Sequence, residues 1–468
     1  MHGSAAYSPA VLHRSREHSL VCFRLAGTGF ADWPINADLE PYYTKAEWEI
    51  GISGMAGGQS LRSSALEALS ATPVASEIFR RPAGAGRNEA RLARLCRTDG
   101  HPLSALSGRC SPTNHDLQPN TFRNQGRAQC GHCGFCELMG CEFGAKSSTL
   151  VSVIPMAEKT GRCEVRPHSY VREIATDSKG RVNGVSYFDS KKKEILQKAK
   201  AVVVCANGAE TPRLLLMSKS SRFPQGLANS SGLVGKYLMF DCGTWAMGVF
   251  EHPLNEYKSV VVTRVVQDFY DADPKRGFYG GGGMDARFDV YPISYALHGL
   301  PTGVPGWGTQ YKRWIQQSFT RSMMILCHLT TLPIESNTIT LDPDIKDAWG
   351  LPAIRVTYKN HPDDLKNKGF FAERALELLE AAGALKMWAG EAEAVHLMGT
   401  CRMGEDPSRS VVDKYHRAHD VPNLFLVDGS NFVSAGRNQP TCTIQALAYR
   451  AAYYIADAAK KGEIPQPA

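Results

Sequence analysis

The amino-acid sequence predicts an α/β fold that also contains an α+β lobe. Two segments carry a buried strand that leads into a helix: "KAVVVCANGAETPRLLLMS" at residues 200–218, and "NLFLVDGS" before the last helix of the chain. Unbroken apolar strands of this kind are typical of parallel sheets. Between them, residues 225–335 mix short strand-like runs with turns, which is typical of an α+β lobe. The length of 468 residues allows two to three domains.

The N-terminal half predicts a helix, a long connection and a hairpin. Residues 32–54 begin with a Trp-Pro turn and continue as a helix that ends at Gly51 and Gly54. Residues 55–129 have weak periodicity, apart from a helical stretch at residues 89–97, and we expect an irregular connection there. Apolar and polar residues then alternate on both sides of "DSKG" at residues 177–180, which predicts an antiparallel hairpin.

The parallel strand of this half spans Ala201 to Ala206, and Pro212 marks the start of the helix that follows. Farther along, the glycine tract at residues 280–283 follows no strand–helix pattern and is expected to form a flexible loop. Residues 336–358 predict two strands around a turn-rich loop, and residues 370–384 predict an amphipathic helix.

The tail from Glu391 onward places a strand end opposite a helix start. The strand "NLFLVDGS" ends in Asp428 and Gly429, and the final helix begins after "GRNQP", at Thr441 or Thr443. A helix N-terminus then faces the carboxyl end of a strand, an arrangement that binds anionic groups such as phosphate. Ordinary packing of a strand against a helix is the alternative explanation at this point.

Composition and charge exclude several classes of protein. A hydrophobic content of 43% and a charged content of 21% fit a soluble globular protein. The net charge of +7 comes from dispersed basic residues, whose densest run, Lys191 to Lys193, is expected in a solvated turn, so we predict no nucleic-acid partner. No run reaches the roughly 18 apolar residues of a transmembrane helix. The N-terminus lacks the apolar core of a secretory signal, which by itself predicts a cytoplasmic protein.

Four cysteines lie within twelve residues, "CGHCGFCELMGC" at 130–141. Their spacing, CxxCxxCxxxxC, is similar to that of cysteines that hold iron–sulfur clusters. CxxC pairs also suit tetrahedral zinc, whereas disulfides require an oxidising compartment. The residues alone leave an iron–sulfur cluster, a zinc site and structural thiols open, and the candidate ligands are Cys130, Cys133, Cys136 and Cys141.

A histidine and two amides in the tail form a candidate catalytic group. His396 stands in "VHLMGT" between apolar residues, where a histidine that only packs in the core is the simpler explanation. Asn438 and Gln439 lie on the loop before the last helix. A base and an amide that converge on a substrate hydroxyl are what alcohol oxidation requires.

These motifs resemble those of the glucose-methanol-choline (GMC) oxidoreductase family, whose members oxidise alcohols with FAD. "HLMGTCRMG" is similar to the family's H-G-T-R-M-G element, and "VPNLFLVDGSNF" is similar to its FAD-contacting strand. "NQPTCTIQALAYRAA" resembles its closing Asn-Pro-Thr helix. "ANGAETPRLLLMS" resembles a second family signature, although Lys219 stands where a glycine is common. The resemblance covers the chain from about residue 30 to residue 460.

The resemblance implies a domain organisation, a reaction and site residues. Residues 1–224, with a cysteine-rich insertion at 130–141, and residues 391–468, with the catalytic loop, would form a GMC-type FAD-binding domain. Residues 225–390 would form a substrate domain with an antiparallel sheet. His396 would take the hydroxyl proton of a small-molecule alcohol, namely a sugar, sugar acid or polyol, while hydride passes to the flavin; Asn438 or Gln439 would orient that hydroxyl. Contacts to FAD would come from Val171, Asp428, Gly429 and Thr441.

One element of the family, a strand followed by a GxGxxG turn and a helix, does not occur in the sequence. The resemblance therefore implies an N-terminally incomplete FAD-binding domain. A non-catalytic or split fragment that cannot bind FAD alone is the alternative function. The cysteine-rich stretch also resembles that of bacterial sugar and gluconate dehydrogenases, in which an iron–sulfur cluster passes electrons to a cytochrome subunit. By this resemblance the protein is a dehydrogenase with an external electron acceptor, and a partner subunit could place it in the periplasm or at a membrane.

Overall fold

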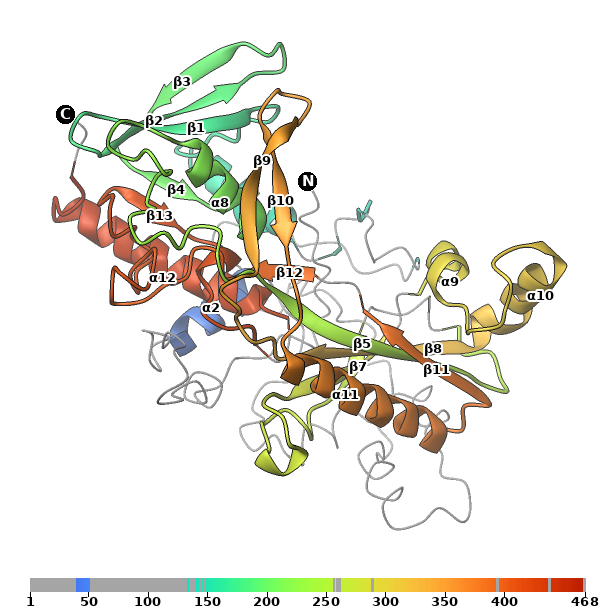
Figure 1. Cartoon of the computed structure of the whole chain (residues 1–468). Helices are drawn as coiled ribbons and strands as arrows, with labels where there is room; N and C mark the ends of the chain where they lie inside the picture. Colours follow the sequence, from blue (N-terminus) through green and yellow to red (C-terminus); the bar gives the residue numbers. More distant parts are fainter. Residues whose placement is uncertain are drawn as a thin grey trace.

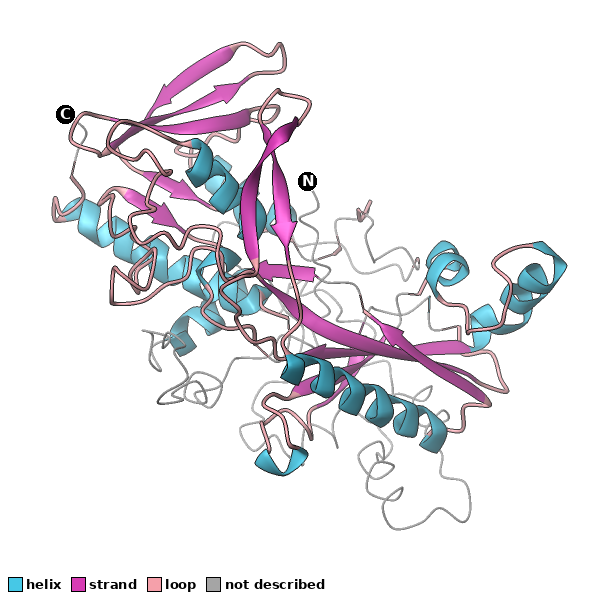
Figure 2. Cartoon of the chain, viewed as in Figure 1, coloured by secondary structure: helices cyan, strands magenta, loops and turns pink. Residues whose placement is uncertain are grey.

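The computed structural model of the chain places helices and strands in two regions, one built around a parallel strand pair and one around a large antiparallel sheet (Figures 1 and 2). The described residues are 39–50, 133, 140–142, 145–146, 148–255, 257, 262–287, 290–392, 395–436 and 439–465. The predicted mixture of α/β and α+β structure is confirmed. The predicted connection at residues 55–129, with its helical stretch, lies outside the described residues.

The parallel pair joins two strands that are far apart in the sequence, and each leads into a helix, as their apolar runs predict. Tyr43 ties the N-terminal helix to the last one, because its hydroxyl lies 2.8 Å from Thr443 Oγ1. Figure 1 shows these two helices side by side. The elements of this region are β4 (Val202–Val204), α8 (Asn207–Met217), β13 (Leu424–Leu426), α12 (Thr441–Lys460) and α2 (Glu40–Ile50).

The large sheet is antiparallel and has six strands in the described part of the chain. Five follow the order β11-β5-β8-β7-β6, and β12 pairs with the beginning of β5. The strands are β5 (Met239–Val249), β6 (Val262–Val266), β7 (Gly282–Arg287), β8 (Ser322–Leu329), β11 (Lys386–Glu391) and β12 (Val395–Met398).

Side chains of this sheet alternate between its two faces. On β8, Ile325 and Cys327 belong to the core beneath α11 (Pro362–Ala381), which lies along one face (Figure 2). His328 therefore belongs to the other face. At one end of that face, Met247 packs against Tyr295 in the cluster formed with the two short helices, α9 (Pro292–His298) and α10 (Gly308–Ser318).

Smaller elements complete the described structure. The hairpin predicted around "DSKG" is confirmed as two antiparallel strands, and a third strand extends it after the turn that contains Lys191 to Lys193. The two strands predicted in residues 336–358 also form an antiparallel pair. No helix in the described ranges is long and apolar enough to cross a membrane. The elements are α7 (Val153–Lys159), β1 (Tyr170–Thr176), β2 (Val182–Phe188), β3 (Glu194–Lys198), β9 (Thr338–Lys346) and β10 (Pro352–Thr357).

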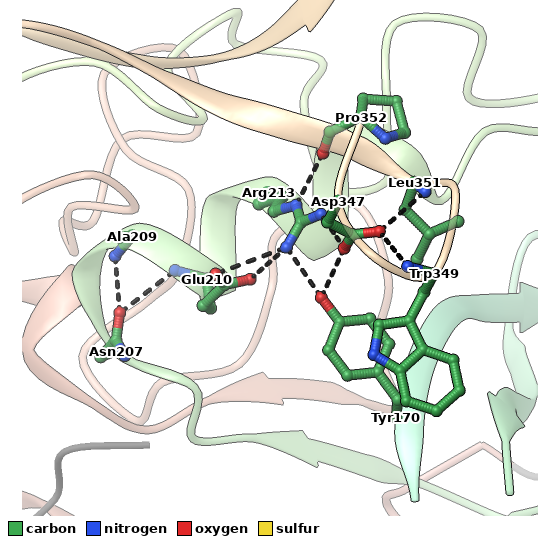
Figure 3. A network of polar contacts seen from close by, with 9 residues as sticks. All are labelled: Tyr170, Asn207, Ala209, Glu210, Arg213, Asp347, Trp349, Leu351 and Pro352. Atoms are coloured by element: carbon green, nitrogen blue, oxygen red, sulfur yellow. Dashed lines mark hydrogen bonds and ion pairs between the residues drawn. The ribbon is translucent and has the colours of Figure 1, made fainter. Parts of the chain in front are cut away.

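A polar network fixes the turn of the β9–β10 hairpin to α8 and β1 (Figure 3). Arg213 Nη2 on α8 donates to Asp347 Oδ2 at 2.7 Å, and its Nη1 donates to the hydroxyl of Tyr170 at 3.0 Å. That hydroxyl in turn donates to Asp347 Oδ2 at 2.8 Å. Trp349 stacks on Tyr170 with 5.0 Å between ring centroids. The turn is therefore held to the parallel-pair region by charge, hydrogen bonds and ring contact.

Pro212 lies inside α8, so the prediction that it starts the helix was wrong. The helix begins at Asn207, whose side-chain oxygen accepts hydrogen bonds from two backbone N–H groups of the first turn. Because proline has no N–H, Pro212 cannot bond to the carbonyl of Gly208 four residues before it. The hydroxyl of Thr400 donates to that carbonyl at 2.7 Å instead. A partner from a distant segment thus makes an internal proline tolerable.

The glycine tract at residues 280–283 is not a flexible loop, which corrects a second prediction. β7 begins at Gly282, where the backbone is buried. A Cβ atom on Gly282 would lie 2.4 Å from the carbonyl oxygen of His328, and one on Gly281 would lie 2.2 Å from that of Tyr270. The glycines therefore allow close backbone approach inside a sheet.

Candidate active site

His396 lies on β12, beside the beginning of β5. The pairing of β12 with β5 is irregular between Val395 and Met398, and His396 lies within this irregular stretch. His396 has a φ of 58°, in the left-handed region that non-glycine residues rarely adopt. Such a backbone costs roughly 1–3 kcal/mol and occurs most often at functional sites. The His396 side chain is 23% exposed, so the strained strand presents an accessible imidazole.

Asp241 on β5 holds this imidazole from behind. Its Oδ2 lies 2.9 Å from His396 Nδ1. Burial would raise the pKa of Asp241, but His328 and His396 lower it below its usual range, so the carboxylate is ionised. An ionised carboxylate only accepts hydrogen bonds, and the proton of the contact must therefore sit on His396 Nδ1. Nε2 of neutral His396 then carries the free lone pair.

His328 on β8 shares the same carboxylate oxygen. Its Nδ1 lies 2.7 Å from Asp241 Oδ2, and its Nε2 lies 3.1 Å from Oδ2 of Asp285 on β7. Burial would lower the pKa of His328, but the two carboxylates raise it to about 10. His328 is consequently an imidazolium near neutral pH, buried between two carboxylates.

Gln439 reaches this cluster from the start of the last helix. Its Nε2 lies 3.1 Å from His328 Nε2. Of the three predicted catalytic residues, His396 and Gln439 are thus linked through Asp241 and His328. The third, Asn438, lies outside the described residues.

The sequence did not predict the other three residues of this cluster, which are Asp241, His328 and Asp285. Asp241 contacts His396, His328 contacts Gln439, and Asp285 contacts His328. Asp241 stands in "LMFDCG", Asp285 in "GGMDAR" and His328 in "ILCHLT". A charged residue inside an apolar strand run is rarely buried without a partner. That pattern was the one signal that could have indicated them, and it does not say which residues meet.

Asp428 and Gly429 form the turn at the end of β13. The carboxylate of Asp428 accepts hydrogen bonds from Asn207 N at 3.1 Å, Thr211 Oγ1 at 2.5 Å and Ser430 N at 2.8 Å. This side chain therefore joins the turn to the start of α8. A Cβ atom on Gly429 would lie 2.9 Å from the carbonyl oxygen of Leu397, next to His396, so glycine brings the turn against β12.

Two further residues, for which the family resemblance implies contacts to FAD, lie at an element end and on an edge strand. Thr441 is the first residue of α12, and the N-cap residue Pro440 makes no side-chain capping bond. Val171 lies on β1, where it pairs with Tyr187 and is 39% exposed. Their contact with a cofactor stays a prediction, as does the division of the chain into domains.

Two of the four clustered cysteines lie within the described residues. Cys133 and Cys141 are free thiols, and Cys141 Sγ accepts a hydrogen bond from Lys146 N at 3.4 Å. Among the residues that the structure describes, no group of three or more His, Cys, Asp or Glu side chains could hold a metal ion. Cys130 and Cys136 lie outside those residues, so the predicted metal site stays untested.

Comparison with known proteins gives family matches to two separate stretches of the chain, and the second stretch contains His396 and Gln439. Family models described as GMC oxidoreductase match residues 116–239 and 333–448. A 2-methyl-1,2-propanediol dehydrogenase from Mycolicibacterium austroafricanum is 36% identical over 460 residues, which cover 96% of this chain and 78% of the relative. A fructose dehydrogenase large subunit from Gluconobacter japonicus is 30% identical over 434 residues, which cover 91% of this chain and 74% of the relative.

A solved structure of formate oxidase from Aspergillus oryzae has a TM-score of 0.48 at 16% identity. The match covers 68% of this chain and 64% of that one, so the chain spans just under two thirds of its length. The family models cover the strand and helix beside Asp428 as well as His396 and Gln439, and the two dehydrogenases match almost the whole chain. The chain therefore belongs to the GMC oxidoreductase family, as its motifs predict, and is an oxidoreductase.

Proposed function

We propose that the chain oxidises a CH–OH group of a small sugar, sugar acid or polyol, with His396 as the base. The observation that carries this proposal is the 2.9 Å contact between Asp241 and His396 Nδ1, which leaves Nε2 of a partly exposed imidazole free to accept a proton. The two dehydrogenases that resemble the chain are named for a vicinal diol and for fructose. Both names denote hydroxyl-bearing substrates of this class.

The residues of the site suit removal of a hydroxyl proton. His396 Nε2 would accept the proton as the adjacent C–H bond breaks, and this role typically contributes 10²- to 10⁴-fold to a rate. The ionised Asp241 keeps the ring in one tautomer and stabilises the imidazolium that forms. Bound FAD would accept the hydride released from the same carbon, which leaves a carbonyl product. Gln439 or Asn438 would orient the hydroxyl oxygen.

The start of α12 has the features of a site for the FAD pyrophosphate. A helix of 20 residues carries partial positive charge at its N-terminus, and here the N-cap residue Pro440 makes no side-chain capping bond. Thr441 would contribute backbone contacts, together with the turn at Asp428 and Gly429, while Val171 would contribute to the adenine side. Because the Asp428 carboxylate already accepts hydrogen bonds from α8, we assign it to shaping the turn.

Replacement of His396 by alanine tests the proposal. In FAD-loaded enzyme we expect turnover of a diol or sugar to fall at least 10²-fold while the flavin absorbance stays unchanged. His252, whose side chain is 84% exposed, provides the matched control, and His252→Ala should keep wild-type turnover. Near-normal turnover of His396→Ala would remove the assignment.

A second candidate function is a chain that does not bind FAD by itself. The observation behind it is Val203 on β4, which is 46% exposed although strands of parallel sheets are normally covered on both faces. Flavin absorbance of the purified chain, measured against protein concentration, separates the two candidates. One flavin per chain removes the second candidate, and a colourless chain supports it.

The finer part of the proposal is that electrons leave to an external acceptor, through an iron–sulfur cluster at the four clustered cysteines and then to a cytochrome or other acceptor subunit. The cysteine spacing supports it. Iron and sulfide assays of anaerobically purified protein, with zinc measured on the same sample, test it. If zinc is found without iron, the four cysteines form a structural zinc site instead of a cluster. If neither metal is found, they are structural thiols.

A further inference from the structure

His328 is placed by the register of three neighbouring strands. On β5 and on β7 the residues directly opposite it are both glycines, Gly243 and Gly283. Asp241 and Asp285 each stand two residues from these glycines and therefore share the face of His328. The imidazole can lie between the strands, where no opposing side chain meets it, and contact one carboxylate on each side.

The two ring nitrogens of His328 are both engaged by the protein, so the ring does not serve as a second base. Nδ1 contacts Asp241, and Nε2 lies within 3.1 Å of both Asp285 and Gln439. In an imidazolium both nitrogens carry protons. The nearest Gln439 atom is a nitrogen as well, so a hydrogen bond forms only when the amide turns and its Oε1 accepts from His328 Nε2.

We infer that His328 is a positioning residue, which fixes His396 through Asp241 and turns the Gln439 amide so that its NH₂ group is left to donate to the substrate oxygen. The inference rests on the proposed function of His396 and Gln439. The hydrogen bond from His328 gives the Gln439 amide one orientation. In that orientation its NH₂ group can stabilise the negative charge that develops on the hydroxyl oxygen as the proton leaves.

The charges around His328 support this role. The groups that face it are Asp241 from β5, Asp285 from β7, His396 from β12 and the neutral amide of Gln439, with 6.3 Å between the two histidine ring centroids. The two carboxylates raise the pKa of His328 to about 10 against the effect of burial. The ring therefore keeps both donors over the pH range in which a histidine base operates.

His328→Gln tests the inference, because it keeps an amide donor for Asp241 and removes the charge and the second donor. In FAD-loaded enzyme we expect kcat to fall about 10- to 100-fold, as is typical when an orienting partner is lost. Flavin absorbance should be retained. The acid limb of the kcat/KM profile should move to higher pH, because Asp241 without its cation holds a proton on His396 more strongly.

His416→Gln is the matched control, since His416 is also buried but contacts Leu426 O and Asn431 Oδ1 rather than carboxylates. It should change thermal stability without moving the acid limb. Asp285→Asn is the second variant, with a milder change of the same cluster. It should move the alkaline limb of the profile to lower pH, because His328 then has one carboxylate fewer.

The outcomes separate this inference from the proposed function. If His396→Ala loses activity while His328→Gln keeps the wild-type kcat and acid limb, the positioning role is wrong and the base assignment stands. If His328→Gln does not fold, an unmoved alkaline limb in Asp285→Asn overturns the inference. Activity in His396→Ala removes the proposed function itself.

Discussion

Replacement of Asp347 by asparagine should loosen the attachment of the β9–β10 hairpin to α8. The Oδ1 atom of Asp347 accepts hydrogen bonds from the backbone of Trp349 at 2.8 Å and Leu351 at 3.0 Å, and Oδ2 accepts from Arg213 and Tyr170 (Figure 3). An asparagine can keep the two backbone bonds through its carbonyl. Its NH₂ group would then face the guanidinium of Arg213, whose side chain is only 5% exposed.

The size of the effect follows from the pKa of Asp347. Partial burial raises it, but the hydrogen bond from Arg213, followed by those from Leu351, Tyr170 and Trp349, lowers it from 3.8 to about 2. Lowering this pKa from 3.8 to about 2 corresponds to roughly 2–3 kcal/mol. Because solvent screens the exposed fifth of this side chain, we expect Asp347→Asn to lower the free energy of unfolding by about 1 to 2 kcal/mol.

The pH dependence provides the decisive test. A carboxylate with a lowered folded-state pKa contributes stability above its unfolded pKa of 3.8, and this contribution is lost as the pH falls through about 2. The difference between wild type and Asp347→Asn should thus be constant from pH 7 to pH 5 and fall to about half by pH 3. Urea unfolding followed by tryptophan fluorescence measures this difference in the free energy of unfolding, because Trp349 stacks on Tyr170 in the network. Asp344→Asn, an exposed change on the same hairpin, is the control. A difference that persists unchanged at pH 3, or that Asp344→Asn reproduces, would refute the role assigned to the ion pair.

Two further predictions concern the large sheet and its helix. Gly282→Ala should lower the free energy of unfolding by about 1–3 kcal/mol, because its Cβ would lie 2.4 Å from the His328 carbonyl oxygen. Gly369→Ala, in the open interior of α11, should raise it by about 1 kcal/mol; equal urea midpoints for the two variants would contradict this assignment. The stability that His328 contributes should be complete below pH 6.5 and lost as the pH rises through about 10, because its folded-state pKa is raised between those values. The unfolding midpoint of wild type should therefore fall more between pH 7 and pH 10 than that of His328→Gln, and parallel curves would show that His328 does not titrate as described.

The parts of the fold that the sequence predicts well depend on local patterns. The hairpin around "DSKG" and the helix after "NLFLVDGS" are each specified within about 20 residues, and both occur where expected. The errors at Pro212 and at the glycine tract have another origin. In each, a distant partner supplies what local chemistry lacks: the Thr400 hydroxyl for the carbonyl of Gly208, and the β8 backbone for Gly282.

The candidate site shows the same limit more sharply. His396 and Gln439 belong to motifs, so the sequence indicates them without any knowledge of their neighbours. Asp241, His328 and Asp285 meet only because three strands align in one register, with glycines opposite the imidazole. A shift of one residue in either strand pair would send the aspartate to the other face of the sheet. No local pattern encodes that alignment.

The charge count of this cluster explains why one buried imidazolium is useful behind a base. Asp241 and Asp285 carry two negative charges, and protonated His328 cancels one of them. With His396 neutral, the four side chains together bear one net negative charge, and this net charge becomes zero when His396 takes a proton. Without the charge on His328, the net charge would be −2 before the proton transfer and −1 after it. His396 would then keep its proton too strongly to act again, which is why the acid limb of His328→Gln should move upward in pH rather than downward.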